Sequence, residues 1–204
     1  MPIVPHTPPG RAGRLWLRER LALAEHAMAL LDTKVRLLRR ELDELVARTA
    51  RTELAFTEAC AVAERWTQRA EISGSARDLR LATPAERADV TVQTGTIMGV
   101  ALPQTVTCRI PAHPAGRDVT GGVAVVAARD AVEQALRAAA DHAAATGARV
   151  AVEQEIARTS QRLLALRNRW IPRLEGGLRT VEATLDEWER ADSARLRWAT
   201  ARDD

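Results

Sequence analysis

The first third of the chain carries a long apolar stripe with coiled-coil spacing. From Leu17, steps of alternately four and three residues meet only uncharged side chains as far as Ala70, although 28% of the chain is charged. A 3.5-residue period predicts a left-handed coiled coil. No proline or glycine occurs between Leu15 and Ile72, so we expect one helix over residues 14–72, roughly 85 Å long. Helices of globular bundles average about 11–12 residues, which disfavours an ordinary bundle helix. The stripe consists of Leu17, Leu21, Ala24, Met28, Leu31, Val35, Leu38, Leu42, Leu45, Thr49, Thr52, Phe56, Ala59, Ala63, Trp66 and Ala70.

The middle segment, residues 73–122, has a different composition. Proline and glycine recur in it and disfavour helix, while residues 89–110 are rich in Val, Thr and Ile, as strands are. Gly95, Gly99 and Pro103 would separate two or three short strands. We therefore expect a small β-hairpin lobe at the far end of the coiled coil. A disordered linker is the alternative, and the clustering of β-branched residues favours the hairpin.

Helical character resumes near Val123 and continues to about Ala199, on the order of 110 Å if unbroken. In this helix Gly147 would mark a weak point or bend, and Pro172 would remove a backbone hydrogen bond and bend the helix. Small alanine side chains in the first part would let another helix approach closely. An apolar stripe is thin at first and then clear, passing through Val132, Leu136, Ala139, Ala143 and Val150, then Ile171, Leu174, Leu178, Val181, Leu185 and Trp188.

These elements predict a mainly α protein: a long antiparallel two-helix left-handed coiled coil with a small β-hairpin lobe between the helices. The expected organisation is one elongated domain, with a tail over 1–13, a helix over 14–72, the hairpin and loop lobe over 73–122 and a second helix over 123–204. The candidate seam and interface residues are Leu31, Val35, Leu38, Leu42, Leu45, Ile171, Pro172, Leu174, Leu178, Val181, Leu185 and Trp188.

Several large apolar residues fall off this seam, and we expect them to meet another protein, because apolar surface outside a two-helix seam needs a further partner. They are Leu15, Trp16, Leu23, Leu30, Leu37, Leu163, Leu166, Trp170 and Trp198.

No pattern of catalytic, cofactor-binding or metal-ligating residues is present in the sequence. It lacks the G-x-x-x-x-G-K-[ST], G-x-G-x-x-G and G-x-S-x-G motifs. The histidines form no H-x-x-x-H pair: we expect His26 and His142 on helix surfaces and His6 and His113 in the tail and loops. Paired carboxylates such as Asp186 and Glu187 read as a solvated helix face. We predict a non-catalytic protein without a cofactor.

The charge balance bears on whether the protein binds nucleic acid or a membrane surface. Thirty basic residues face 27 acidic ones, for a net charge of +3, which argues against a nucleic-acid-binding protein. The pI of about 9.6 leaves a nucleic-acid or membrane-surface binder as an alternative, and the interleaving of opposite charges disfavours it. Two cysteines without a C-x-x-C pair favour a reducing compartment, with a single disulfide as the alternative. With no apolar signal segment and no apolar run near 20 residues, we expect a cytoplasmic protein without membrane insertion.

Three blocks of the sequence resemble the D subunit of the V/A-type ATPases (ATP synthases). RLWLRERLALAEHAMALLDTKVRLL, residues 14–38, is similar to the family's opening helix, and TIMGVALP, residues 96–103, to its short central strand. The most specific block is RTSQRLLALRNRWIPRLEGGLRTVEATLDEWERADSARLR, residues 158–197. The chain departs from the family at Ala27, where glycine is usual, and at Arg167, where glutamate is usual. A coiled-coil scaffold or adaptor outside any ATPase is therefore a second hypothesis.

The resemblance implies a non-catalytic central-stalk protein, the rotor shaft that couples ATP hydrolysis or synthesis to rotation and ion translocation. In this family the coiled-coil tip near both termini lies inside a hexamer of catalytic and regulatory subunits. The middle carries the small F subunit, and the base docks on the funnel-shaped subunit above the membrane rotor ring. The protein would then be peripheral to the membrane through the complex.

Overall fold

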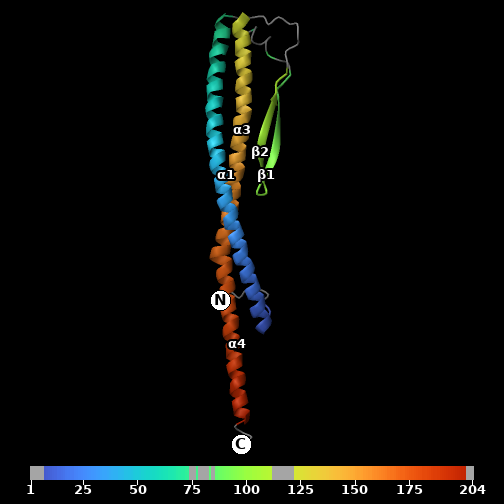
Figure 1. Cartoon of the computed structure of the whole chain (residues 1–204), viewed down its shortest axis with the longest axis vertical. Coiled ribbons are helices and arrows are strands. Elements are labelled where there is room, and N and C mark those ends of the chain that lie inside the picture. Colours follow the sequence, from blue (N-terminus) through green and yellow to red (C-terminus); the bar gives the residue numbers. More distant parts are fainter. Residues whose placement is uncertain (1–6, 74–76, 78–82, 84–85, 112–121, 201–204) are drawn as a thin grey trace. The chain divides into compact units, whose positions relative to one another are not determined.

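The structure, a computed structural model, describes residues 7–73, 77, 83, 86–111 and 122–200 (Figure 1). The predicted mainly helical class, with an antiparallel two-stranded hairpin between the helices, is confirmed. Its elements are α1 (Gly10–Ser73), β1 (Asp89–Ile97), β2 (Val100–Arg109), α3 (Gly122–Ala165), the π-helical turn η1 (Leu166–Trp170) and α4 (Ile171–Thr200). The expectations for His6 and His113 fall outside the described residues.

The chain divides into two compact units: unit 1 comprises Met1–Arg36 with Ala157–Asp204, and unit 2 comprises Leu37–Ile156. The expectation of one elongated domain stays a prediction.

In unit 2 the second part of α1 packs against α3 in antiparallel fashion. Near the C-terminal end of α1, Ala70 and Trp66 contact Val125 at the start of α3. Toward the other end of the unit, Leu38 and Leu45 share a cluster with Val152. Contacts therefore run in opposite directions along the two helices, as the hairpin topology requires.

Along α1 every position of the apolar stripe from Leu17 to Ala70 is buried or half-buried. The stripe mixes large and small side chains, and the facing surface of α3 is mainly alanine: Ala128, Ala131, Ala144, Ala145 and Ala148 are all buried. Large residues on one helix against small ones on the other allow a close approach without voids.

The expected stripe over the alanine-rich part of α3 is wrong by one residue. Val132, Leu136, Ala143 and Val150 are exposed, and only Ala139 of the predicted stripe is half-buried. The residues one position earlier are all buried or half-buried: Ala131, Ala135, Ala138, His142 and Arg149. The cause is η1. There the backbone N–H of Ile171 donates to the carbonyl of Leu166, five residues back instead of four, so this turn holds one extra residue. Regular heptad spacing upstream of Leu174 does not allow for this extra residue. Every position that it predicts in α3 therefore lies one residue too far toward the C-terminus.

The π turn directly precedes Pro172, where the sequence predicts a bend. In an α-helix the proline ring would clash with the carbonyl four residues earlier, and proline has no N–H to donate. A wider turn moves that carbonyl and absorbs the disruption. By contrast, α3 continues through Gly147 without a break; a weak point or bend at Gly147 stays a prediction.

The β-hairpin is one continuous pair of strands rather than a set of short strands. Its two-residue turn is Met98–Gly99, both with positive φ (51° and 80°), which matches the twist of a hairpin. Gly99 is thus the expected break, but Gly95 and Pro103 lie inside the strands. The pairing shifts between Gln93 and Thr94, leaving Gln104 as an unpaired bulge residue next to Pro103, the kind of position where a strand tolerates proline.

The hairpin lies along the helices of unit 2 (Figure 1). Leu102 is buried against Leu38, Leu45, Ala148 and Val152, with Ile97 and Val100 packed at the edge of the same cluster. The Arg48 guanidinium donates to the carbonyl of the bulge residue Gln104 at 3.2 Å. The predicted lobe at the end of the coiled coil is therefore corrected: the turn of the hairpin folds back onto the helix pair, because its apolar residues have a seam to cover there.

In unit 1 the first part of α1 packs against α4, again antiparallel. Leu17 and Ala24 form a buried cluster with Leu174, surrounded by half-buried residues. Across the pair, the Arg18 guanidinium contacts Glu182 at 2.6 Å and Arg11 contacts Glu189 at 3.5 Å.

Candidate partner-binding surface

The described residues contain no group of three or more His, Cys, Asp or Glu side chains that could hold a metal ion. His26 is exposed, as expected. His142 is not: it is half-buried in unit 2, with its Nδ1 3.2 Å from Thr52 Oγ1 and its ring stacked on Phe56 at 6.0 Å and 7°. The surface assignment of His142 is wrong for the same reason as the α3 stripe, because it lies one position before Ala143.

Of the candidate seam residues on α1, Val35, Leu38 and Leu45 are buried, and Leu31 and Leu42 are half-buried. On α4, Leu174 and Leu185 are buried. The half-buried residues there are Ile171, Leu178 and Val181.

Pro172 and Trp188 are exposed and lie outside the helix–helix seam. Trp188 falls there because α1 begins at Gly10, so little of the partner helix remains to cover it. Both residues instead line a groove of about 1040 Å³ in unit 1.

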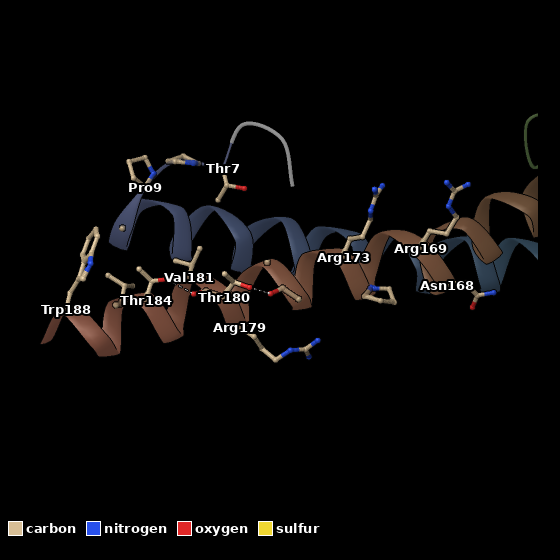
Figure 2. Close-up of a pocket in the computed structure, with 16 residues that line it drawn as sticks. Thr7, Pro9, Asn168, Arg169, Arg173, Arg179, Thr180, Val181, Thr184 and Trp188 are labelled. Atoms are coloured by element: carbon tan, nitrogen blue, oxygen red, sulfur yellow. Dashed lines mark hydrogen bonds between the residues drawn. The ribbon is translucent and has the colours of Figure 1, made fainter. Parts of the chain in front are cut away.

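This groove runs between the N-terminal segment Thr7–Gly10 and one face of α4 (Figure 2). Along that face small residues alternate with polar ones, and the Thr180 and Thr184 hydroxyls donate to carbonyls one turn earlier, at 3.0 and 2.9 Å. Those bonds satisfy the threonine hydroxyls within the helix, so the groove wall is less polar than its sequence suggests.

A second hollow of about 500 Å³, also in unit 1, is lined by Leu31 of α1 and by residues around η1. Three of its lining residues are arginines, Arg162, Arg169 and Arg173. The whole-chain charge balance hides this concentration: residues 157–179 hold six arginines and a single acid, Glu175. A count by segment would have found it.

Most of the apolar residues expected to meet another protein are indeed exposed: Leu15, Leu23 and Leu30 at 57–61%, Trp198 at 75%. Trp16 is an exception, since it packs against the Leu17 cluster. Leu163 and Leu166 are half-buried, because the extra residue in η1 turns them toward the seam.

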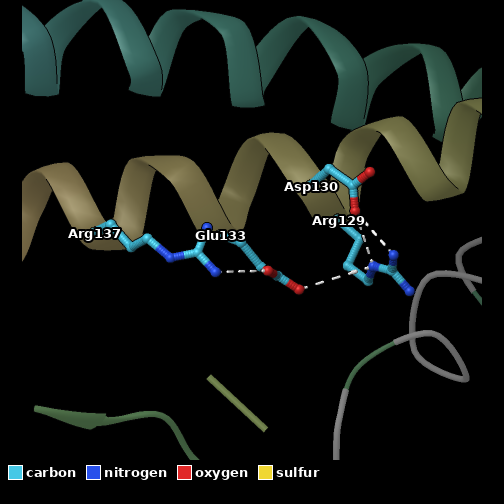
Figure 3. Close-up of polar contacts among 4 residues, drawn as sticks. All are labelled: Arg129, Asp130, Glu133 and Arg137. Carbon is cyan, nitrogen blue, oxygen red and sulfur yellow. Dashed lines mark hydrogen bonds and ion pairs between the residues drawn. The ribbon is translucent and has the colours of Figure 1, made fainter. Parts of the chain in front are cut away.

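The arginines of α3 in unit 2 behave differently. Arg129 contacts Asp130 at 2.9 Å and Glu133 at 3.9 Å, and Glu133 also contacts Arg137 at 3.2 Å (Figure 3). The two pairs with Glu133, each spaced four residues apart, stabilise the helix by about 0.3–0.5 kcal/mol each. The arginines on this face of α3 thus have acidic partners on the same helix.

The model of the ATP synthase D-subunit family matches residues 15–201, which covers most of α1 and all of β1, β2, α3, η1 and α4. The chain belongs to the ATP synthase D-subunit family. No curated protein matches the sequence.

Membership of the D-subunit family identifies the chain as a stalk protein of a rotary ATPase, and hence as part of an ATPase complex. Stalk proteins of this family are generally non-catalytic. Among the helices that the structure describes, none combines the length and apolar character needed to cross a membrane.

Proposed function

We propose that this chain is the central rotor shaft, or D subunit, of a V/A-type rotary ATPase, coupling ATP hydrolysis or synthesis in the head to rotation and ion translocation. The observation that carries the proposal is the family match over residues 15–201. It includes both long helical elements and the hairpin, so the match extends over every part that a shaft would need.

A shaft transmits torque and makes or breaks no covalent bond. Torque requires that the two helices not slide or twist past each other. In unit 1 the buried Leu17–Leu174 cluster resists sliding, and the Arg18–Glu182 contact at 2.6 Å links the helices across their surface. In unit 2 the hairpin adds a third layer over Leu38 and Leu45.

A shaft must also present unequal faces to its surroundings. In unit 1 the α4 side carries the Pro172–Trp188 groove, and the α1 side carries the exposed leucines Leu15, Leu23 and Leu30. As such a shaft turns, each catalytic site meets a different surface, which shifts its equilibrium between nucleotide-binding states.

The partners proposed are the hexamer of catalytic and regulatory subunits, the small F subunit of the stalk and the funnel subunit above the membrane rotor ring. The exposed apolar residues of unit 1 would contact the hexamer. The complex would hold the chain in the cytoplasm, peripheral to the membrane.

The test is co-expression of the full chain with the head subunits, the F subunit and the funnel subunit, followed by native mass spectrometry. We expect one copy of the chain in a complex with a hexameric head, and loss of coupled ion transport when the chain is omitted. If the head assembles and the chain associates with none of these proteins, the shaft role is refuted and a scaffold outside the ATPase is the better explanation.

A further inference from the structure

One surface of unit 1 concentrates positive charge around an apolar hollow. Arg162, Arg169 and Arg173 are all exposed and line the hollow together with Leu31, Ala165, Leu166 and Trp170. Within the described part of the chain, none of these three arginines forms an ion pair or a side-chain hydrogen bond. We call this surface the arginine hollow.

These three arginines lie together around one apolar hollow, and they differ from the arginines of the protein that pair with acids. In unit 1 Arg18 reaches Glu182 on the opposite helix, and in unit 2 Arg129 and Arg137 both reach Glu133. Like charges gathered without counter-charges repel one another and create a local positive potential. Such a potential attracts an acidic group from outside the chain.

The floor of the hollow is apolar. Leu31 and Leu166 are half-buried there, and Trp170 remains 43% exposed. Trp170 ends the π-helical turn η1, and such turns occur frequently at functional sites. Arginine and tryptophan are among the residues most enriched at the energetic centres of protein interfaces.

The arginines are also arranged to act together. Arg169 and Arg173 extend from the helix in the same direction, whereas Arg179 extends from its other side (Figure 2). Arg162, Arg169 and Arg173 border the same hollow, so one ligand could contact them at once. A guanidinium can bind a carboxylate through two parallel hydrogen bonds, which fixes orientation as well as charge.

We propose that the arginine hollow binds an acidic amphipathic segment of another protein, whose carboxylates pair with Arg162, Arg169 and Arg173 while one of its apolar side chains enters the hollow. The inference rests on the proposed function only in assigning that segment to a protein that surrounds the stalk.

Two observations favour a protein over a nucleic acid. The apolar floor between the arginines suits a leucine or phenylalanine side chain better than a phosphate backbone. Further along the same helix, residues 180–189 hold four acids and no base, and Glu182 and Glu189 occupy arginines of α1. A nucleic acid following the helix would find no basic side chain of that helix over this stretch, whereas a short acidic peptide would not reach it.

The experiment uses the full chain and a fluorescein-labelled helical peptide built of glutamate and alanine with one leucine per two turns. Binding is followed by fluorescence anisotropy at low and at physiological salt. We expect saturable binding that weakens with salt, as exposed charge pairs do. Replacing the glutamates of the peptide by glutamine should abolish it.

The matched variants are Arg162→Gln/Arg169→Gln/Arg173→Gln in the hollow and Arg39→Gln/Arg40→Gln/Arg51→Gln, three exposed arginines of unit 2 with neighbouring acids. Both lose the same charge. Exposed ion pairs contribute modestly one by one, so loss of all three in the hollow predicts about tenfold weaker peptide binding. The control variant should bind nearly as well as the unmodified chain. Arg→Lys at the three hollow positions keeps the charge but loses the paired hydrogen bonds, so its affinity should lie between those of the hollow variant and the unmodified chain.

Equal affinity of the hollow and control variants would overturn the proposal, as would unchanged binding of the glutamine peptide. Tighter binding of a single-stranded oligonucleotide than of the acidic peptide, lost in the hollow variant, would assign the surface to nucleic acid instead. Helicity of each variant is checked by circular dichroism, and the comparison of the two peptides on the unmodified chain does not depend on any variant folding.

Co-expression separates this inference from the proposed function. If the unmodified chain joins the head and the hollow variant joins it equally well without peptide binding, the inference fails and the shaft role stands. If the chain binds the peptide but no head subunit, the surface is real and the assignment to the ATPase fails.

Discussion

Leu38→Ala is expected to be among the most damaging single truncations in unit 2. Leu38 has no exposed surface and packs against Leu45, Leu102, Ala148 and Val152, so it joins both helices and the hairpin. The change removes three carbon groups at about 0.8 kcal/mol each, or about 2.4 kcal/mol of transfer free energy. The cavity left in a rigid three-layer contact adds to this, giving a loss of about 3–4 kcal/mol in the free energy of unfolding.

The assay is urea unfolding followed by far-UV circular dichroism, with Leu54→Ala as the control. Leu54 lies on the same helix within unit 2 but is 66% exposed, so the same chemical change should cost less than about 0.5 kcal/mol. Amide hydrogen exchange in β2 should also become faster in Leu38→Ala, because Leu102 shares its buried cluster with Leu38. Equal destabilisation by the two changes, or no effect on β2, would refute the assignment of Leu38 to a core shared by helices and hairpin.

Three further predictions test other parts of the fold. Ala145→Leu should lower the free energy of unfolding in urea by about 1–3 kcal/mol, because Ala145 has no exposed surface. Ala143→Leu, at an exposed position, should change it by less than about 0.5 kcal/mol. Similar effects of the two changes would contradict the one-residue shift in α3. Gly99→Ala should cost about 1–2 kcal/mol in the same assay, since φ there is +80°, and a neutral effect would argue against the two-residue turn. Leu178→Asp places a carboxylate beside the Leu17 cluster and should cost about 2 kcal/mol or more, visible as a lower melting temperature; unchanged melting would show that this side of α4 is not a seam.

The pattern of apolar positions was sufficient to predict the first helix and its buried face. That success follows from length: over so long a run of heptad spacing, a wrong register would have brought charges into the stripe at once. The pattern also predicts the stripe of α4, but it places Trp188 in the seam because apolar spacing does not reveal where the partner helix begins.

Two features could not be derived in this way. An extra residue in η1 leaves no mark in composition, so the stripe upstream was placed one residue late, and His142 with it. The position of the hairpin depends on a few long-range contacts, chiefly those of Leu102, and local strand propensity carries no information about them. The arginine hollow is hidden for a different reason: the net charge of the whole chain does not reveal a local excess of arginine over residues 157–179.

The π turn is a one-residue insertion in an otherwise regular helix, and Pro172 fixes its position. Such an insertion costs the least free energy just before a residue that has no amide hydrogen. The extra residue therefore stays at Leu166–Trp170 and does not shift along the helix. With alanine at position 172 the insertion could shift along the helix. Each residue that it passed would then turn away from the partner helix. A single ring therefore decides where two different phases of the same heptad pattern meet.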